Sequence, residues 1–203
     1  MVALDALGGN AVRFTNYEKP HEQNDLYKQA TIWEAARATS SAPTFFDPIE
    51  LICDGSRRKF VDGGFGHNNP VNELWMEAQT EFGPGALEPQ IRFILSVGTG
   101  KPTMKKIGSS LKEFGETILK RVSETQRTAN DFLRMHEELD NNNGYFRFNP
   151  PELDEVGLDE AGKKDIIQQR TEFYGQEVEV VKTMKKFSGI ALDPERTYDS
   201  YPR

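Results

Sequence analysis

Residues 60–70, FVDGGFGHNNP, constrain the fold of this chain more than any other segment. They predict a strand that ends at Asp62-Gly63-Gly64, where glycines let the backbone turn. A helix is expected to follow at once, because Asn69 suits the N-cap and Pro70 suits the first helical position. Gln90–Val97 is an apolar run typical of a buried strand. The succession of strand, helix and strand is typical of an α/β fold with crossover connections.

Further elements are expected on both sides of this segment. The predicted strands are Val2–Leu7, Ala11–Tyr17, Ile49–Cys53, Lys59–Val61 and Tyr145–Phe148, and the predicted helices are Thr31–Thr39, one or two between residues 109 and 139, and Asp159–Phe187. Thr31 is a candidate N-cap of the first of these helices, whose apolar side would be Ile32, Ala35, Ala36 and Ala38. Asp54-Gly55-Ser56 favours a hairpin turn, and residues 18–28 are expected to form a surface loop. The apolar positions expected to face a core in the two C-terminal helical regions are Leu111, Phe114, Ile118, Val122, Ala129, Phe132, Leu139, Ile166, Ile167, Phe173, Val178, Val181 and Met184. We therefore expect an α/β fold with a central, mostly parallel sheet, flanking helices and two long amphipathic C-terminal helices.

The charge and cysteine content of the chain excludes several classes of protein. The formal net charge is -7, so the basic surface of a nucleic-acid-binding protein is not expected. The single cysteine, Cys53, cannot form an internal disulfide and fits a reducing compartment. The N-terminal MVALDALGG lacks the basic region of a signal peptide, and no apolar run reaches the ~20 residues that span a bilayer. These features predict a soluble, cytoplasmic protein.

The start of the chain lies inside a predicted strand. Val2–Leu7 and Ala11–Tyr17 would form a hairpin around the turn-forming Leu7-Gly8-Gly9-Asn10. A chain that begins inside a strand, with no polar residues before it, suggests a truncated sequence. The alternative is an edge strand at a true N-terminus.

The Asp62-Gly63-Gly64 segment resembles the corresponding motif of the patatin-like phospholipases. The resemblance extends in order over most of the chain, through Ala36–Pro43, the strand that ends at Gly98-Thr99-Gly100, and Tyr145–Phe148. It implies a patatin-like α/β fold and a Ser–Asp dyad that hydrolyses the acyl esters of lipids. Residues 1–78 would be the C-terminal part of the catalytic core, and residues 79–203 the remaining strand and helices of the same domain.

Asp62 is the candidate general base, and Gly63 and Gly64 are the motif glycines. A carboxylate at a strand end lies where α/β folds place their ligands, and the glycines remove side-chain bulk beside it. A general base must come within about 2.6–3.2 Å of the serine oxygen that it deprotonates. The alternative is that Asp62-Gly63 is only a turn.

The nucleophile itself is missing from the sequence. The activated serine of this kind of fold sits in a G-x-S-x-G turn, and none of the nine serines has glycine on both sides at that spacing. The family's glycine-rich oxyanion loop is also absent. His67 suggests a Ser-His-Asp triad, but without such a serine we interpret it as a loop histidine. One cysteine and three histidines are too few for a zinc site, and no metal or other cofactor is expected.

Two main functional hypotheses follow. In the first, the chain is part of a lipid acyl hydrolase, supplies the Asp62 base and is inactive alone; its substrate would be a phospholipid or a neutral acyl lipid, with transient contact to a membrane surface. In the second, it is a degenerate, non-catalytic patatin-like module that binds lipid or a protein partner. A third alternative is an unrelated α/β fold whose motifs match by coincidence.

Overall fold

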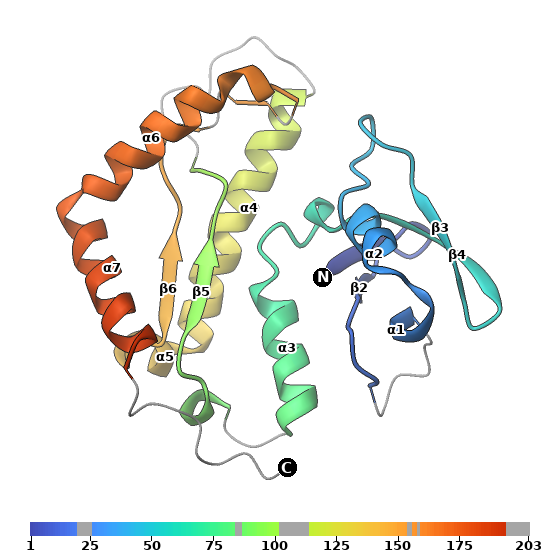
Figure 1. Ribbon diagram of the computed structural model, residues 1–203, viewed down its shortest axis with the longest axis horizontal. Helices are drawn as coiled ribbons and strands as arrows, with labels where there is room; N and C mark the ends of the chain where they lie inside the picture. Colours follow the sequence, from blue (N-terminus) through green and yellow to red (C-terminus); the bar gives the residue numbers. More distant parts are fainter. Residues whose placement is uncertain (20–25, 84–86, 102–113, 154–155, 158, 194–203) are drawn as a thin grey trace. The chain divides into compact units, whose positions relative to one another are not determined.

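The computed structural model describes residues 1–19, 26–83, 87–101, 114–153, 156–157 and 159–193. The chain divides into two compact units, Met1–Gly83 and Pro84–Arg203. Each unit combines strands with helices, which confirms the predicted α/β class (Figure 1).

The first unit is built on a four-stranded sheet. Its strands are β1 (Val2–Asp5), β2 (Ala11–Arg13), β3 (Ile49–Cys53) and β4 (Ser56–Asp62), in the order β2-β1-β4-β3. Every neighbouring pair is antiparallel, so the expectation of a mostly parallel sheet is wrong for this unit. The reason is the short connections: Asp54-Gly55 alone joins β3 to β4, whereas a parallel pair needs a crossover of about a dozen residues. Asp54 and Gly55 both have positive φ, as a tight hairpin turn requires.

Three helices accompany this sheet: α1 (Leu26–Gln29), α2 (Ile32–Thr39) and α3 (Val71–Phe82). Thr31 is the N-cap of α2, as predicted, because its side chain accepts a hydrogen bond from the Glu34 N–H while the Glu34 carboxylate accepts one from the Thr31 N–H. Helix α2 packs against β1, β3 and β4. The buried residues of the main core cluster are Ala3, Phe14, Leu26, Ala35, Ala38, Leu51, Cys53 and Phe60.

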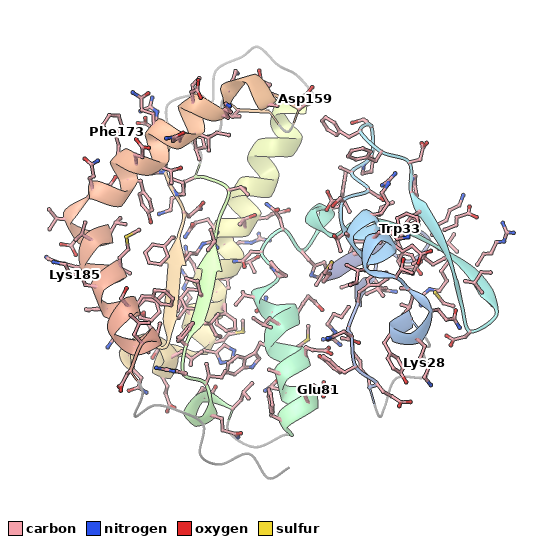
Figure 2. All side chains as sticks on the ribbon, in the orientation of Figure 1. Lys28, Trp33, Glu81, Asp159, Phe173 and Lys185 are labelled. Carbon is pink, nitrogen blue, oxygen red and sulfur yellow. The ribbon has the colours of Figure 1, made fainter. Side chains whose placement is uncertain are left out.

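The apolar face expected for α2 is only partly correct. Ala35 and Ala38 are buried, but Ile32 is 83% exposed and Ala36 is also exposed. Trp33 projects outward from the same helix (Figure 2). The short helix therefore buries small side chains and leaves its large ones outside.

The second unit is built on a two-stranded parallel sheet of β5 (Ile94–Val97) and β6 (Tyr145–Phe148). Its helices are α4 (Phe114–Met135), α5 (Glu137–Asn141), α6 (Lys164–Gln176) and α7 (Val178–Ala191), with short 3₁₀ helices η2 (Glu88–Gln90) and η3 (Ala161–Lys163). Tyr145 contacts Phe132 of α4, whereas the adjacent Phe146 contacts Phe187 of α7. Since successive strand residues point to opposite faces, α4 and α7 cover opposite faces of this sheet.

Several expectations for this unit need correction. The predicted strand Gln90–Val97 begins only at Ile94, after the turn η2. The single predicted helix Asp159–Phe187 is two helices, because Glu177 adopts an extended conformation with ψ 134° between α6 and α7.

The predicted core of the C-terminal helices is largely wrong. Phe173 is 59% exposed and points away from its helix (Figure 2), and Val178 is 68% exposed. Ile166, Ile167 and Met184 are also exposed, and Val180 is buried instead. In the preceding helices Ala129, Phe132 and Leu139 are buried as predicted. Leu111 lies outside the described residues, and so do the side chains of Phe114, Ile118 and Val122.

Candidate functional site

The candidate base, Asp62, is the last residue of β4. Its backbone is held on two sides: β4 pairs with β1 at Ala3, and the Asp62 N–H donates to the Ser41 carbonyl oxygen at 3.1 Å. The side chain is half-buried. The position at a strand end agrees with the sequence, but the sheet around it is antiparallel, so the rule for ligands at parallel strand ends does not apply within this unit.

A short turn after Asp62 holds its carboxylate. Residues Gly63–Phe65 form the 3₁₀ helix η1, and the Gly64 N–H donates to Asp62 Oδ1 at 2.7 Å. The Gly63 carbonyl oxygen accepts from the Gly66 and His67 N–H groups at 3.3 and 2.8 Å. Within the part of the chain that the structure describes, Asp62 Oδ2 has no hydrogen-bond donor. One carboxylate oxygen is therefore fixed, and the other can accept a hydrogen bond or a proton.

The two motif glycines are needed for space rather than for a left-handed backbone, since neither has a positive φ. Gly63 is buried against β1: an added Cβ would overlap the Val2 carbonyl oxygen and lie 3.0 Å from the Val2 carbonyl carbon. At Gly64 an added Cβ would lie 3.1 Å from Asp62 Oδ1. Close approach of the turn to β1 and to the carboxylate therefore explains both glycines.

The segment after α2 lies beside Asp62, and it was predicted only as part of the motif set. Ser41 is fully buried, and its hydroxyl donates to the Arg37 carbonyl oxygen at 2.7 Å. The Arg37 guanidinium donates to Ser41 Oγ at 2.6 Å and to the Asp47 carbonyl oxygen at 2.7 Å. The Ser41 hydroxyl is thus engaged in structural hydrogen bonds. Thr44, in the turn that follows, has φ 78°, a strained value for a β-branched residue.

Helix α3 brings two buried glutamates to this unit, a feature that sequence reasoning missed. Glu77 Oε2 contacts Arg13 Nε at 2.9 Å and Lys19 Nζ at 3.0 Å, and the Tyr17 hydroxyl donates to Glu77 Oε1 at 2.7 Å. Burial by itself would raise the pKa of Glu77, but the Tyr17 hydroxyl and the two cations outweigh it and lower that pKa. Burial and the adjacent Glu77 carboxylate raise the pKa of Tyr17. Lys19, expected in a surface loop, is buried here.

The second buried glutamate, Glu73, contacts the histidine of the motif. Glu73 Oε1 lies 3.3 Å from His67 Nδ1, and Glu73 Oε2 lies 3.8 Å from Arg13 Nη1. The spacing of Glu73 and Glu77, one helical turn apart, is the signal that could have placed both on one face. The structure therefore links Asp62, its glycine turn, His67 and helix α3 into one local site.

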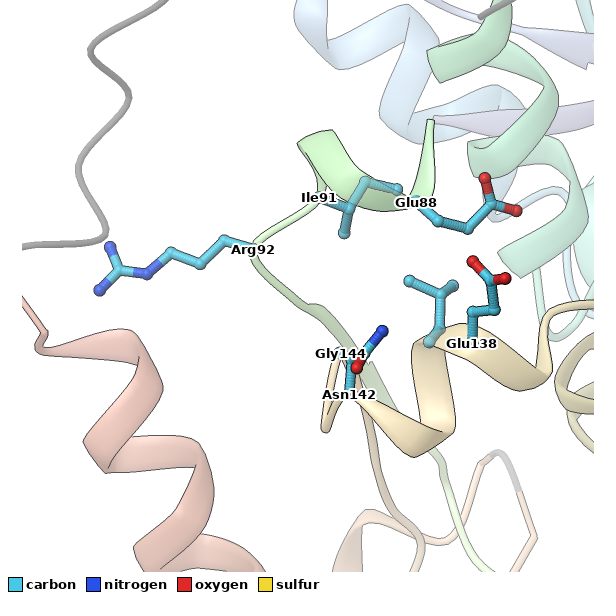
Figure 3. A pocket seen from close by; sticks show the side chains of 7 residues that line it. Glu88, Ile91, Arg92, Glu138, Asn142 and Gly144 are labelled. Atoms are coloured by element: carbon cyan, nitrogen blue, oxygen red, sulfur yellow. The ribbon is translucent and has the colours of Figure 1, made fainter. Parts of the chain in front are cut away.

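A separate hollow of ≈ 250 Å³ lies in the second unit (Figure 3). It is lined by Glu88, Ile91, Arg92, Glu138, Leu139, Asn142 and Gly144. The Glu88 and Glu138 side chains point toward each other, while Arg92 points away and donates to carbonyl oxygens at the end of α7. His136 Nδ1 lies 3.2 Å from Glu88 Oε1. The chemistry of this hollow is mainly acidic, and none of the predicted site residues lines it.

Two further observations on the described ranges concern metal binding and membrane insertion. No group of three or more His, Cys, Asp or Glu side chains there is arranged to hold a metal ion. No helix within those ranges is both long and apolar enough to cross a bilayer.

Comparison with known proteins identifies the family. The model of the patatin-like phospholipase family matches residues 5–75, which include β4, Asp62 and the first turn of α3. The chain belongs to the patatin-like phospholipase family. This patatin-like chain is 29% identical to mouse calcium-independent phospholipase A2-gamma over 91% of its own length and 23% of the relative. It is 26% identical to the mouse 85/88 kDa calcium-independent phospholipase A2 over 79% of its length and 24% of the relative.

The human calcium-independent phospholipase A2-gamma is 30% identical over 83% of the chain and 20% of the relative. The patatin-like chain thus spans about a quarter or less of the length of the curated relatives that it matches. The matched segment contains Asp62, its glycine turn, His67 and Glu73, so the family relation and the geometry concern the same residues.

Proposed function

We propose that the chain supplies the general base of a lipid acyl hydrolase, and that Asp62 is this base. The observation that carries the proposal is the state of the Asp62 carboxylate: Oδ1 is held by the Gly64 N–H, and Oδ2 is without a donor among the described residues. A carboxylate fixed through one oxygen can present the other to a serine hydroxyl. The residues that hold it lie in the segment that matches the patatin-like family.

The reaction requires a serine that this sequence does not contain in a G-x-S-x-G turn. In the first step the serine oxygen bonds to the ester carbonyl carbon, and its proton passes to Asp62. The carbonyl carbon then releases the alcohol, which takes the proton from Asp62. In the second step water attacks the acyl-serine, Asp62 accepts the water proton and returns it to the serine, and the fatty acid leaves.

The relatives suggest the substrate class. Their names describe phospholipases A2 that are calcium-independent, and we infer a phospholipid as the substrate, with hydrolysis that needs no metal. Contact with a membrane surface would then be transient. We also propose that residues 1–78 and 79–203 belong to one patatin-like domain.

The test uses the 203-residue chain and a longer product of the same gene. The 203-residue chain should not hydrolyse a chromogenic short-chain ester or a phospholipid, because it has no serine in a G-x-S-x-G turn (an elbow serine). A longer product whose upstream codons encode G-x-S-x-G should be active, and Asp62→Asn should lower its activity by about 10²–10⁴-fold. Gly66→Ala is the matched control in the same turn, since nothing lies within 4 Å of an added Cβ there.

Two outcomes would overturn the proposal: Asp62-dependent turnover by the short chain alone, or full activity of the longer Asp62→Asn protein. A non-catalytic module that binds lipid or a protein partner is the second candidate, favoured by the absence of the elbow serine. Upstream codons that encode unrelated sequence, together with inert protein, would support this second function.

A further inference from the structure

The turn that holds Asp62 is closed by its own hydrogen bonds and contacts neighbouring elements at both of its ends. Gly63 accepts from the Gly66 and His67 N–H groups, which fold residues 63–67 back on the end of β4. On the β1 side the turn is in close contact with Val2. At its other end, the side chain that leaves the turn toward α3 is His67, and it contacts Glu73.

Glu73 connects this turn to β2, the strand at one edge of the sheet. Its carboxylate is buried, with 10% of the side chain exposed, and it lies between His67 Nδ1 and Arg13 Nη1. Arg13 belongs to β2, which pairs with β1, and β1 pairs with β4 at Asp62. A continuous set of contacts therefore runs from Asp62 through the turn, His67 and Glu73 to Arg13 of β2. Strand β1, which pairs with both β2 and β4, connects Arg13 back to the strand that carries Asp62.

We propose that Glu73 and His67 are a positioning pair for Asp62. The Glu73 carboxylate lies 3.3 Å from His67 Nδ1 and so restrains the ring, the ring restrains the end of the glycine turn, and the turn holds the Gly64 N–H on Asp62 Oδ1. The ring can donate from Nδ1 both as the neutral Nδ1–H tautomer and in its protonated form. Neither residue has to touch the substrate, so the pair acts only through Asp62.

The inference rests on the proposed function only in treating Asp62 as a base, and its test does not use catalysis. Hydrogen exchange of the Gly64 amide in the 203-residue chain reports the hydrogen bond to Asp62. His67→Ala should make this amide exchange about tenfold faster, which corresponds to the loss of one hydrogen bond. His67→Asn should restore the slow exchange, because its side-chain nitrogen can donate from nearly the position of Nδ1.

Two further variants separate positioning from general stability. Glu73→Gln should also speed exchange at Gly64, whereas Glu81→Gln should not, because Glu81 is exposed on the same helix. Amides of the sheet core, such as that of Phe60, should exchange at the wild-type rate in all folded variants. Should Glu73→Gln fail to fold, the two His67 variants still decide the question.

A spectroscopic readout completes the test. Long-range ¹H–¹⁵N spectra of the imidazole should show His67 protonated on Nδ1. A neutral ring protonated only on Nε2, or unchanged Gly64 exchange in folded His67→Ala, would overturn the positioning pair. If the Gly64 exchange rates change as expected and His67 is protonated on Nδ1, but the longer product hydrolyses no lipid, the proposed function fails and the positioning contact stands.

Discussion

Gly63→Ala should be strongly destabilising, because the turn after Asp62 lies directly against the backbone of β1. The added Cβ would lie 3.0 Å from the Val2 carbonyl carbon and closer still to its oxygen, where ordinary contacts begin at 3.4 Å. Val2 belongs to β1, whose neighbours β2 and β4 lie on both sides, so neither backbone can yield cheaply. We expect a loss of about 3 kcal/mol of unfolding free energy, at the upper end of overpacking costs.

Two neighbouring glycines provide a graded comparison. Gly64→Ala should cost about 1 kcal/mol, because only the Asp62 carboxylate, 3.1 Å away, has to move. Gly66→Ala should change the unfolding free energy by less than about 1 kcal/mol, since its added Cβ meets nothing within 4 Å. The order of the three effects follows from the geometry alone.

Urea unfolding followed by tryptophan fluorescence measures these effects. Both tryptophans, Trp33 and Trp75, lie in the first unit, so the signal reports that unit. With an m-value of about 1.5 kcal/mol/M, the Gly63→Ala midpoint should fall by about 2 M. A Gly63→Ala midpoint within the range of Gly66→Ala would refute the claim that contact with Val2 is what requires a glycine.

Three further predictions concern the core and the buried charges. Phe60→Ala removes a fully buried ring that packs edge-on against a second phenylalanine, so it should cost about 3–5 kcal/mol in the same fluorescence assay, against less than about 1 kcal/mol for the exposed Ile52→Ala. The lowered pKa of Glu77 means that the folded state binds fewer protons than the unfolded state, so the stability that Glu77 contributes is present at neutral pH and lost as pH falls through the acidic range. Glu77→Gln should therefore make the unfolding free energy depend less steeply on pH in the acidic range. An unchanged dependence would contradict the assignment. Arg147→Met should leave the thermal midpoint by circular dichroism unchanged or raise it. The Arg147 Nη1 donates to Ser96 Oγ, but Nε and Nη2 are buried without hydrogen-bond partners among the described residues; a large fall in the midpoint would show that the guanidinium is satisfied.

Local features of the sequence were sufficient to predict most element positions. Thr31 was expected as an N-cap, Asp54-Gly55 as a hairpin turn and Tyr145–Phe148 as a strand, and the structure confirms all three. Asp62 was expected at the end of a strand, and it is the last residue of β4. Its role as the base stays a prediction, because these 203 residues contain no serine in a G-x-S-x-G turn that Asp62 could deprotonate.

The sequence by itself therefore determined where most strands and helices occur, because these depend largely on neighbouring residues along the chain. It did not determine every boundary: Asn69 was expected as the N-cap of α3, and the N-cap is Pro70. Only the tertiary structure decided that the sheet of the first unit is antiparallel and that Gly63 is needed for its approach to Val2. It also decided that the charged Glu73 is buried between His67 and Arg13. The contacts of Glu73 with Arg13 and of Gly63 with Val2 join residues far apart in sequence, and burial of a carboxylate is tolerated only where the fold brings donors to it.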